Sequence, residues 1–167
     1  MLDSLELNTA EWHITNSRSF IAVESDMKNL KNVRLQNDCF VSSGCRFDAS
    51  DHEIRLGSHC IVGEDVKVLP PGEDVIFGNY VTVYPRCDIR AKAVGDHVEI
   101  GADSKVGEGV VVSASSVIQP ESVVLPGTKV PTKCVFGGNP ARYVVELPDA
   151  INGTIRLRNE RLLSRLR

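Results

Sequence analysis

Apolar residues recur at every sixth position along the middle of the chain, between Val94 and Phe136. The recurring residues are Val94, Ile100, Val106, Val112, Ile118, Val124, Val130 and Phe136. In every hexad but the first, the position two residues earlier is small or β-branched, as at Ser104 and Val110. A period of six matches neither an α-helix nor the alternation of a strand, and short internal repeats are typical of a parallel β-helix. We therefore predict an all-β fold of hexapeptide repeats.

Each hexad is predicted to form a short strand followed by a tight corner, so that three hexads complete one triangular coil. Residues three hexads apart then stack on the same face, about 4.8 Å apart along the ladder. This places Val112 beside Val130, and each buried Val or Ile contributes roughly 1.5–3 kcal/mol. Glycine follows the first three recurring positions, as at Gly101, and we expect it to relax the corner backbone.

The register of the hexads divides the chain into three segments. Residues 1–32 lack the repeat and are expected to form an arm that caps the first coil, whose ladder end is otherwise exposed. Residues 33–137 are predicted to form the β-helix, with about five to six coils. Residues 138–167 are predicted to hold a terminating segment and an α-helix over Ile155–Leu166, with Asn152-Gly153-Thr154 interrupting any earlier start.

The register breaks twice within the repeat. The first break spans residues 48–53, and the second spans Leu69–Asp74. The second contains Pro70-Pro71-Gly72, and proline cannot donate a hydrogen bond to a ladder. We predict a protruding loop there.

Bulk composition limits the classes of function. The chain has 167 residues, a net charge of -3 and 5% aromatic residues, which fits one domain with a narrow aliphatic core. This charge predicts no general attraction to nucleic acid. No apolar run is long enough to span a bilayer, and the start of the chain lacks a signal-peptide pattern. We expect a cytoplasmic protein without membrane insertion.

The five cysteines share one place in the repeat, two residues before an inward apolar residue. They are Cys39, Cys45, Cys60, Cys87 and Cys134. An odd number is a poor fit to a disulfide framework, and the shared position is the small inward slot. We predict small buried core residues, neither metal ligands nor nucleophiles.

Four histidines are the candidates for chemistry: His13, His52, His59 and His97. In acyl transfer, a histidine on a loop can act as the general base. His52 alone lies in a break of the register, so it is the histidine to consider for that role. His59 and His97 each follow a corner glycine by two residues and are expected at solvated corners.

The stretch 46–57, with Val81-Thr82-Val83 beyond it, resembles the pattern of gamma-class carbonic anhydrases. In that family three histidines hold a zinc ion that activates water. The resemblance places these histidines at Leu69, Pro85 and Arg90, none of which offers a suitable ligand. The resemblance thus implies the scaffold without its metal site, and we assign no catalytic, cofactor-binding or metal-binding residue.

The segment Gly137–Arg142 is similar to the tail of many hexapeptide acyltransferases, whose coils wind left-handed. That resemblance supplies the hand, which the spacing alone leaves open. The fold class is therefore predicted as a single-stranded left-handed parallel β-helix with a C-terminal α-helix.

A further resemblance extends over nearly the whole chain, to the dynactin subunit 5 family. It rests on Arg55–Val62 with the following Pro70-Pro71, on Val124–Pro131, on Val135–Pro148, and on Asn37–Cys39 and Glu11-Trp12. The resemblance implies a non-catalytic, cofactor-free structural subunit of the dynactin pointed-end complex, cytoskeleton-associated and supporting cargo selection by dynein. The implied partners are subunit 6, subunit 4 and the actin-related pointed-end protein. The alternative is an enzyme, either gamma-carbonic-anhydrase-like or of the hexapeptide acyltransferase type.

Outward positions late in the repeat are apolar, unlike the earlier ones. They are Val111, Val117 and Val123, with Leu125 close by in the sequence. Exposed apolar surface usually marks a contact. The C-terminal helix is expected to cover one of the three faces, and we predict that the rest of these residues bind a partner or another copy.

Overall fold

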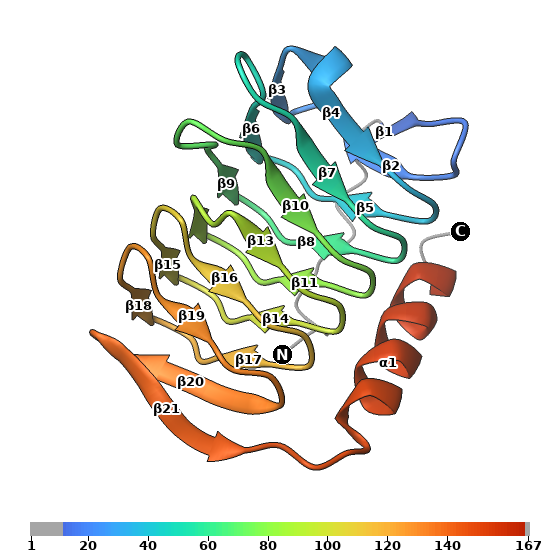
Figure 1. Ribbon diagram of the computed structural model, residues 1–167. Coiled ribbons are helices and arrows are strands. Elements are labelled where there is room, and N and C mark those ends of the chain that lie inside the picture. The colour runs from blue at the N-terminus through green and yellow to red at the C-terminus, as the bar shows by residue number, and fades with distance from the viewer. Residues whose placement is uncertain (1–11, 166–167) are drawn as a thin grey trace.

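The computed structural model of the chain describes residues 12–165. The backbone winds as a triangular solenoid of about six turns, with one helix at its C-terminal end (Figure 1). Three sheets form the sides of the triangle, and the chain visits them in the same order in every coil. The prediction of a hexapeptide left-handed β-helix is confirmed.

The strands fall into three sheets, which we name A, B and C. Sheet A contains nine strands: β1 (Trp12–Ile14), β2 (Phe20–Ala22), β5 (Phe40–Val41), β8 (Ile61–Val62), β11 (Thr82–Val83), β14 (Glu99–Ile100), β17 (Val117–Ile118), β20 (Cys134–Gly138) and β21 (Ala141–Glu146). Sheet B contains six: β3 (Asp26–Lys28), β6 (Arg46–Asp48), β9 (Lys67–Val68), β12 (Asp88–Ile89), β15 (Lys105–Val106) and β18 (Val123–Val124). Sheet C contains six: β4 (Val33–Leu35), β7 (Ile54–Leu56), β10 (Val75–Phe77), β13 (Ala93–Val94), β16 (Val111–Val112) and β19 (Lys129–Val130). A short 3-10 turn, η2 (Leu30–Asn32), precedes β4, and the helix is α1 (Ile151–Arg165).

The ladder has the register that the hexads predict. Ile100 pairs with Ile118 in sheet A, and Val112 pairs with Val130 in sheet C. The recurring apolar side chains point inward and are almost completely buried, and Ile100 has no exposed surface. Each coil thus adds one layer of aliphatic side chains to a continuous column.

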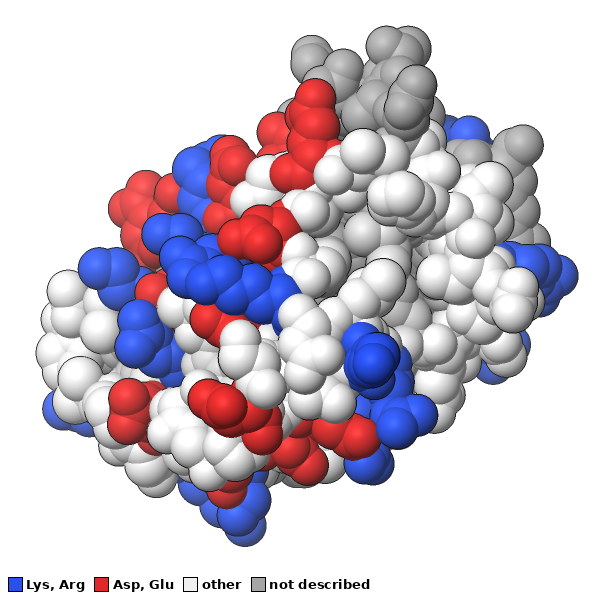
Figure 2. Space-filling model, turned by 90° about the horizontal axis from the view of Figure 1, so that it is seen from above, with Lys and Arg blue, Asp and Glu red and all other residues white. Residues whose placement is uncertain are grey.

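The N-terminal segment joins the ladder before residue 33. Strands β2 and β3 pair in parallel with β5 and β6, and β1 pairs antiparallel with β2. At this end of the solenoid lies a hollow of about 720 Å³, whose lining includes Ile14, Val23 and Leu30. Figure 2 looks onto this end and shows charged side chains gathered mainly to one side of a broad uncharged area. Residues 1–11, part of the predicted cap, lie outside the described residues.

Helix α1 begins at Ile151, earlier than the sequence predicts, and it includes Asn152-Gly153-Thr154. Its buried residues are Ile155, Asn159 and Leu163, four residues apart along one face. Asn159 donates a hydrogen bond to the carbonyl of His59 at 3.1 Å and accepts one from the Thr82 hydroxyl at 3.0 Å. Packing against sheet A therefore outweighs the roughly 1 kcal/mol that glycine costs within a helix.

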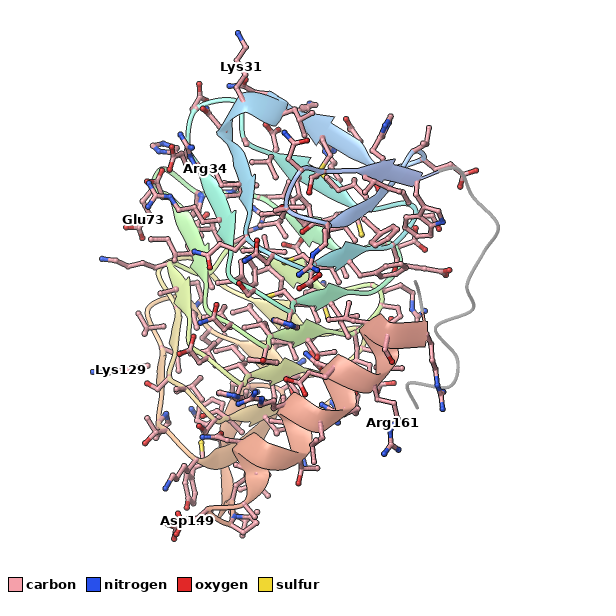
Figure 3. The ribbon with its side chains drawn as sticks, turned by 90° about the vertical axis from the view of Figure 1, so that its right-hand side faces the viewer. Lys31, Arg34, Glu73, Lys129, Asp149 and Arg161 are labelled. Carbon is pink, nitrogen blue, oxygen red and sulfur yellow. The ribbon has the colours of Figure 1, made fainter. Side chains whose placement is uncertain are left out.

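The end of α1 lies at the limit of the described chain. Leu166, the last residue of the predicted helix, lies outside the described residues. Figure 3 shows α1 lying across the strands, with the Arg161 side chain pointing away from the solenoid. Arg34, Glu73 and Lys129 lie along the edge of the molecule away from α1. Within residues 12–165, no helix has both the length and the apolar character needed to cross a membrane.

All five cysteines are buried and unpaired with one another, which confirms the prediction that they fill the small inward slots. Burial raises the pKa of the Cys45 thiol to about 12 and that of the Cys87 thiol to about 11. Thiols that stay protonated at neutral pH are poor nucleophiles. The thiols of Cys45 and Cys87 are therefore expected to be unreactive, as well as buried in the core.

The glycines after the inward residues serve a different purpose from the predicted one. Gly95 and Gly101 lack the positive φ that would call for glycine's conformational freedom. A Cβ at Gly101 would lie 2.4 Å from the backbone nitrogen of Pro120 in the next coil, and one at Gly95 would lie 2.6 Å from that of Ala114. Glycine is needed because adjacent coils approach closely at this corner.

Two alanine substitutions test the close approach of adjacent coils at the corner glycines. Gly101→Ala is expected to lower the free energy of unfolding by about 1–3 kcal/mol, because the clash is with backbone that cannot move aside. The control is Gly153→Ala, whose Cβ has no neighbour within 4 Å; it should raise helix stability by up to about 1 kcal/mol. Urea unfolding of both variants measures the difference. Equal effects would show that the corner has room for a side chain.

Candidate functional site

Two long corners between sheets B and C correspond to the two breaks in the hexad register that the sequence shows. The corner after β6 spans residues 49–53, and the corner after β9 spans residues 69–74. The prolines keep the second corner out of the ladder, and Gly72 adopts a φ of +122° that favours glycine. The protruding loop is thus confirmed.

Between these corners lies a groove of about 460 Å³, which we call the His52 groove. Its lining residues are Arg46, Asp48, Ser50, Asp51, His52, Leu69, Pro70 and Gly72. Most of these residues are polar, and the loop residues Leu69 and Pro70 supply an apolar wall. The groove therefore combines titratable groups with a surface that can hold a small organic group.

His52 lies beside a carboxylate from the neighbouring corner. Its Nδ1 lies 3.8 Å from Oδ1 of Asp74, which is an ion-pair distance rather than a hydrogen bond. The same oxygen of Asp74 accepts a hydrogen bond of 2.8 Å from the backbone N–H of Glu53. The Glu53 amide thus fixes Asp74, and Asp74 faces one nitrogen of the imidazole. The other nitrogen, Nε2, makes no hydrogen bond to residues 12–165.

A second pair of charges lines the other side of the groove. The Ser50 hydroxyl and backbone amide both hydrogen-bond to Oδ1 of Asp48, at 2.6 and 3.3 Å. These bonds hold the pKa of the Asp48 carboxyl below its usual range. Arg46 approaches Asp48 at 3.9 Å and Asp26 at 4.0 Å. Both are ion-pair distances without a hydrogen bond, so Arg46 is held near two carboxylates while its N–H groups make no side-chain hydrogen bond within residues 12–165.

Zinc does not fit the three positions at which the carbonic anhydrase resemblance places its histidines. Leu69 and Arg90 lie at adjacent levels of one corner, where the Leu69 amide donates to the carbonyl of Ile89 at 3.0 Å. Pro85 lies at a different corner, next to Arg86. Among residues 12–165, no group of three or more His, Cys, Asp or Glu residues is arranged to hold a metal ion. We therefore derive no step that depends on zinc.

Two of the remaining histidines support the structure around α1. His59 and His97 lie at successive levels of one corner, with Tyr80 stacked between their rings at centroid distances of 4.8 and 5.2 Å. The Tyr80 hydroxyl donates a 3.0 Å hydrogen bond to Glu160 of α1. His13 lies on β1 and lines the hollow at the end of the first coil, and it is not among the residues that line the His52 groove.

The sequence singled out His52 as the histidine to consider as a base without assigning it that role, and it gave no sign of Asp74 and Arg46 as neighbours of the same groove. Asp74 is the last residue of the Pro-Pro-Gly break, and the break itself was the available signal. Arg46 belongs to the carbonic-anhydrase-like stretch, but only the stacking of β6 on β9 places it beside the loop. The grouping depends on how the long corners stack, which no local pattern encodes.

The predicted partner-binding residues lie on all three sides of the solenoid. Val111 is on β16 of sheet C, Val117 on β17 of sheet A and Val123 on β18 of sheet B, and all three are half-buried. Leu125 follows β18 and is 47% exposed. They form no single patch, and their role in binding stays a prediction.

Sequence comparison connects the chain with a known enzyme class. No protein-family profile matches the sequence. Gamma carbonic anhydrase 1 from Arabidopsis thaliana mitochondria is 32% identical over 143 residues, which is 81% of this chain and 51% of that protein. Gamma carbonic anhydrase 2 from the same source is 34% identical over 83 residues, or 50% of this chain and 28% of that protein. The chain thus spans about half or less of the length of these relatives.

Comparison with solved structures supports the same fold. A hexapeptide transferase family protein from Anaplasma phagocytophilum superposes with a TM-score of 0.67 at 16% identity, over 87% of this chain and 89% of the other. AntD, an N-acyltransferase from Bacillus cereus in complex with dTDP and 3-hydroxybutyryl-CoA, gives 0.73 at 14% identity, over 89% of each chain. Identities this low show the fold alone.

These comparisons correct one expectation. The sequence resemblance predicted a protein that is not an enzyme, and that prediction is contradicted. The relatives in sequence are gamma carbonic anhydrases, which are enzymes, whereas the likeness to the solved structures concerns the fold. The similar proteins named above include no dynactin subunit.

Proposed function

We propose that this chain, whose sequence and fold support a place in the gamma-carbonic-anhydrase-like, hexapeptide-repeat superfamily, is an acyltransferase. The observation that carries the proposal is the His52–Asp74 pair in an open groove, held by the Glu53 amide. A carboxylate that orients an imidazole is the usual support of a general base. Carbonic anhydrase chemistry is the weaker choice, because the residues at the three ligand positions do not fit zinc.

The chemistry proposed for the groove needs only this chain's residues and two substrates. His52 Nε2 takes a proton from the amine or hydroxyl of the acceptor, whose lone pair attacks the carbonyl carbon of an acyl thioester. The new bond to carbon forms as the carbon–sulfur bond breaks, and the proton held by His52 passes to the departing thiolate. Arg46 is proposed to bind a phosphate of the thioester donor, as guanidinium groups commonly do.

Calorimetry with coenzyme A tests this proposal directly. Wild-type protein should bind coenzyme A with measurable heat, and Arg46→Ala should weaken the binding about 10-fold, because a charge-assisted contact contributes roughly 1.5–3 kcal/mol when it is not solvent-screened. The matched control is Arg86→Ala, because Arg86 is engaged with Asp103 in two hydrogen bonds elsewhere. Absence of binding by the wild type would refute the proposal.

A second candidate function is assembly into the dynactin pointed-end complex, as the counterpart of dynactin subunit 5. The sequence likeness around the Pro70-Pro71 loop and at the coil terminus supports it. In this proposal the partners are subunit 6, subunit 4 and the actin-related pointed-end protein. The protein is then cytoplasmic and associated with the cytoskeleton. Val111, Val117, Val123 and Leu125 are then the proposed contact residues.

Affinity capture with mass spectrometry separates the two candidates. Recovery of dynactin subunits with the wild-type chain, reduced by Leu125→Lys, would support the assembly role. Leu125 is exposed, so this substitution should leave the fold intact. Recovery of no dynactin subunit would remove the second candidate and leave the acyltransferase proposal standing.

A further inference from the structure

The last strand of sheet A is the most exposed apolar strand in the described part of the chain. In β21, Tyr143 is 55% exposed, Val144 is 50% exposed and Val145 is 53% exposed. Every residue of β21 after Ala141 is exposed, so both faces of the strand meet solvent. Six residues is long for this solenoid, in which most strands have two or three. Packing among residues 12–165 does not account for a strand of this kind.

The outer edge of β21 has no partner among residues 12–165. Sheet A ends at β21, which pairs antiparallel with β20 on one side only. Figure 1 shows β21 as the outermost strand at the end of the solenoid far from β1. Its outer backbone N–H and C=O groups are thus open for pairing with another strand. An irregularity in the pairing leaves Val144 without a partner on β20.

The sequence of β21 is complementary to itself when two copies run antiparallel. With Val144 opposite Val144 of a second copy, Arg142 faces Glu146, and Tyr143 faces Val145. By symmetry each of these pairs occurs twice. Opposite charges and aromatic–β-branched pairs across strands each contribute favourably. Neither Arg142 nor Glu146 takes part in a salt bridge within residues 12–165, so both charges are available.

We propose that β21 is the interface of a two-fold symmetric dimer of this chain, in which the β21 strands of two copies pair antiparallel around Val144. Sheet A then continues from one solenoid into the next, and the open edge disappears. The contact is isologous: the same six-residue strand supplies both halves. The proposal is independent of the His52 groove, which lies at the corner between sheets B and C.

Charge reversal tests the proposed pairing. Sedimentation equilibrium of the full chain should show a dimer. Arg142→Glu and Glu146→Arg should each weaken dimerisation on the order of 30-fold, because each replaces two attractions with two repulsions. The double variant R142E/E146R restores both attractions and should dimerise like the wild type. An equimolar mixture of the two single variants should form a heterodimer. Circular dichroism checks that each variant is folded.

Cysteine crosslinking locates the symmetry axis. Val144→Cys brings two thiols directly opposite each other, about 4.5–5.5 Å apart at Cβ, so that mild oxidation should give a covalent dimer. Leu157→Cys is the control, because Leu157 is 66% exposed and lies on α1, outside the proposed interface strand. The five native cysteines are buried and should stay unreacted. A monomer at all concentrations would overturn the proposal, and so would an oligomer that is insensitive to charge reversal or crosslinks equally at both positions.

Discussion

Replacing Ile100 with alanine is expected to lower the free energy of unfolding by about 2–5 kcal/mol. Ile100 is completely buried and stacks between Val83 and Ile118 in adjacent coils. The stacked neighbours Val83 and Ile118 are held in place by their own strands, so they can fill the resulting cavity only in part. Since a whole domain is stable by only about 5–15 kcal/mol, this single change removes a large share. Urea unfolding followed by circular dichroism measures the loss.

Ile76→Ala is the matched control for this substitution. Ile76 also lies on a β-strand of the ladder, but its side chain points outward and is 45% exposed. The same loss of atoms should therefore cost less than about 1 kcal/mol, because it opens no cavity. Similar losses for both variants would contradict an inward column as the source of stability.

Replacing His52 with glutamine is expected to lower kcat for acyl transfer by about 100- to 10,000-fold, the usual contribution of a general base. Glutamine keeps the size and polarity of the side chain but cannot accept the proton. Binding of coenzyme A should be unchanged, because the proposed anion contact is with Arg46. Steady-state kinetics with an acyl-CoA donor, together with calorimetry, separates the two effects.

His13→Gln is the control for the histidine variant. His13 is exposed on β1 and lines the hollow at the end of the first coil, outside the His52 groove. Its substitution should leave kcat unchanged. A loss of rate in both variants would show that the effect does not arise in the groove.

Asp74→Asn should lower kcat by a smaller factor than His52→Gln, because Asp74 is a positioning residue.

The repeat could be predicted from sequence because one rule governs every coil. The recurring apolar residue and the small residue two positions before it specify the inward column directly, and residues such as Val112 and Cys134 occupy their predicted places. The Pro-Pro-Gly break likewise marks a loop, because proline has no amide hydrogen to donate.

The features that the sequence did not reveal depend on contacts between distant segments. The early start of α1 depends on Asn159 reaching His59 and Thr82, which lie far away in the chain. The need for glycine at Gly101 arises from the backbone of the next coil rather than from its own φ. The groove depends on the stacking of two long corners, which brings Asp74 to His52. None of these follows from a local pattern.

The most direct test of the proposed function is the consumption of an acyl-CoA thioester by protein that has been treated with a chelator. Mass spectrometry of the reaction with an amine acceptor reports both loss of the thioester and formation of the amide. We expect transfer by the metal-free wild type and its loss in His52→Gln. Absence of transfer by the wild type, or activity that requires a stoichiometric zinc ion, would contradict the proposed acyltransferase.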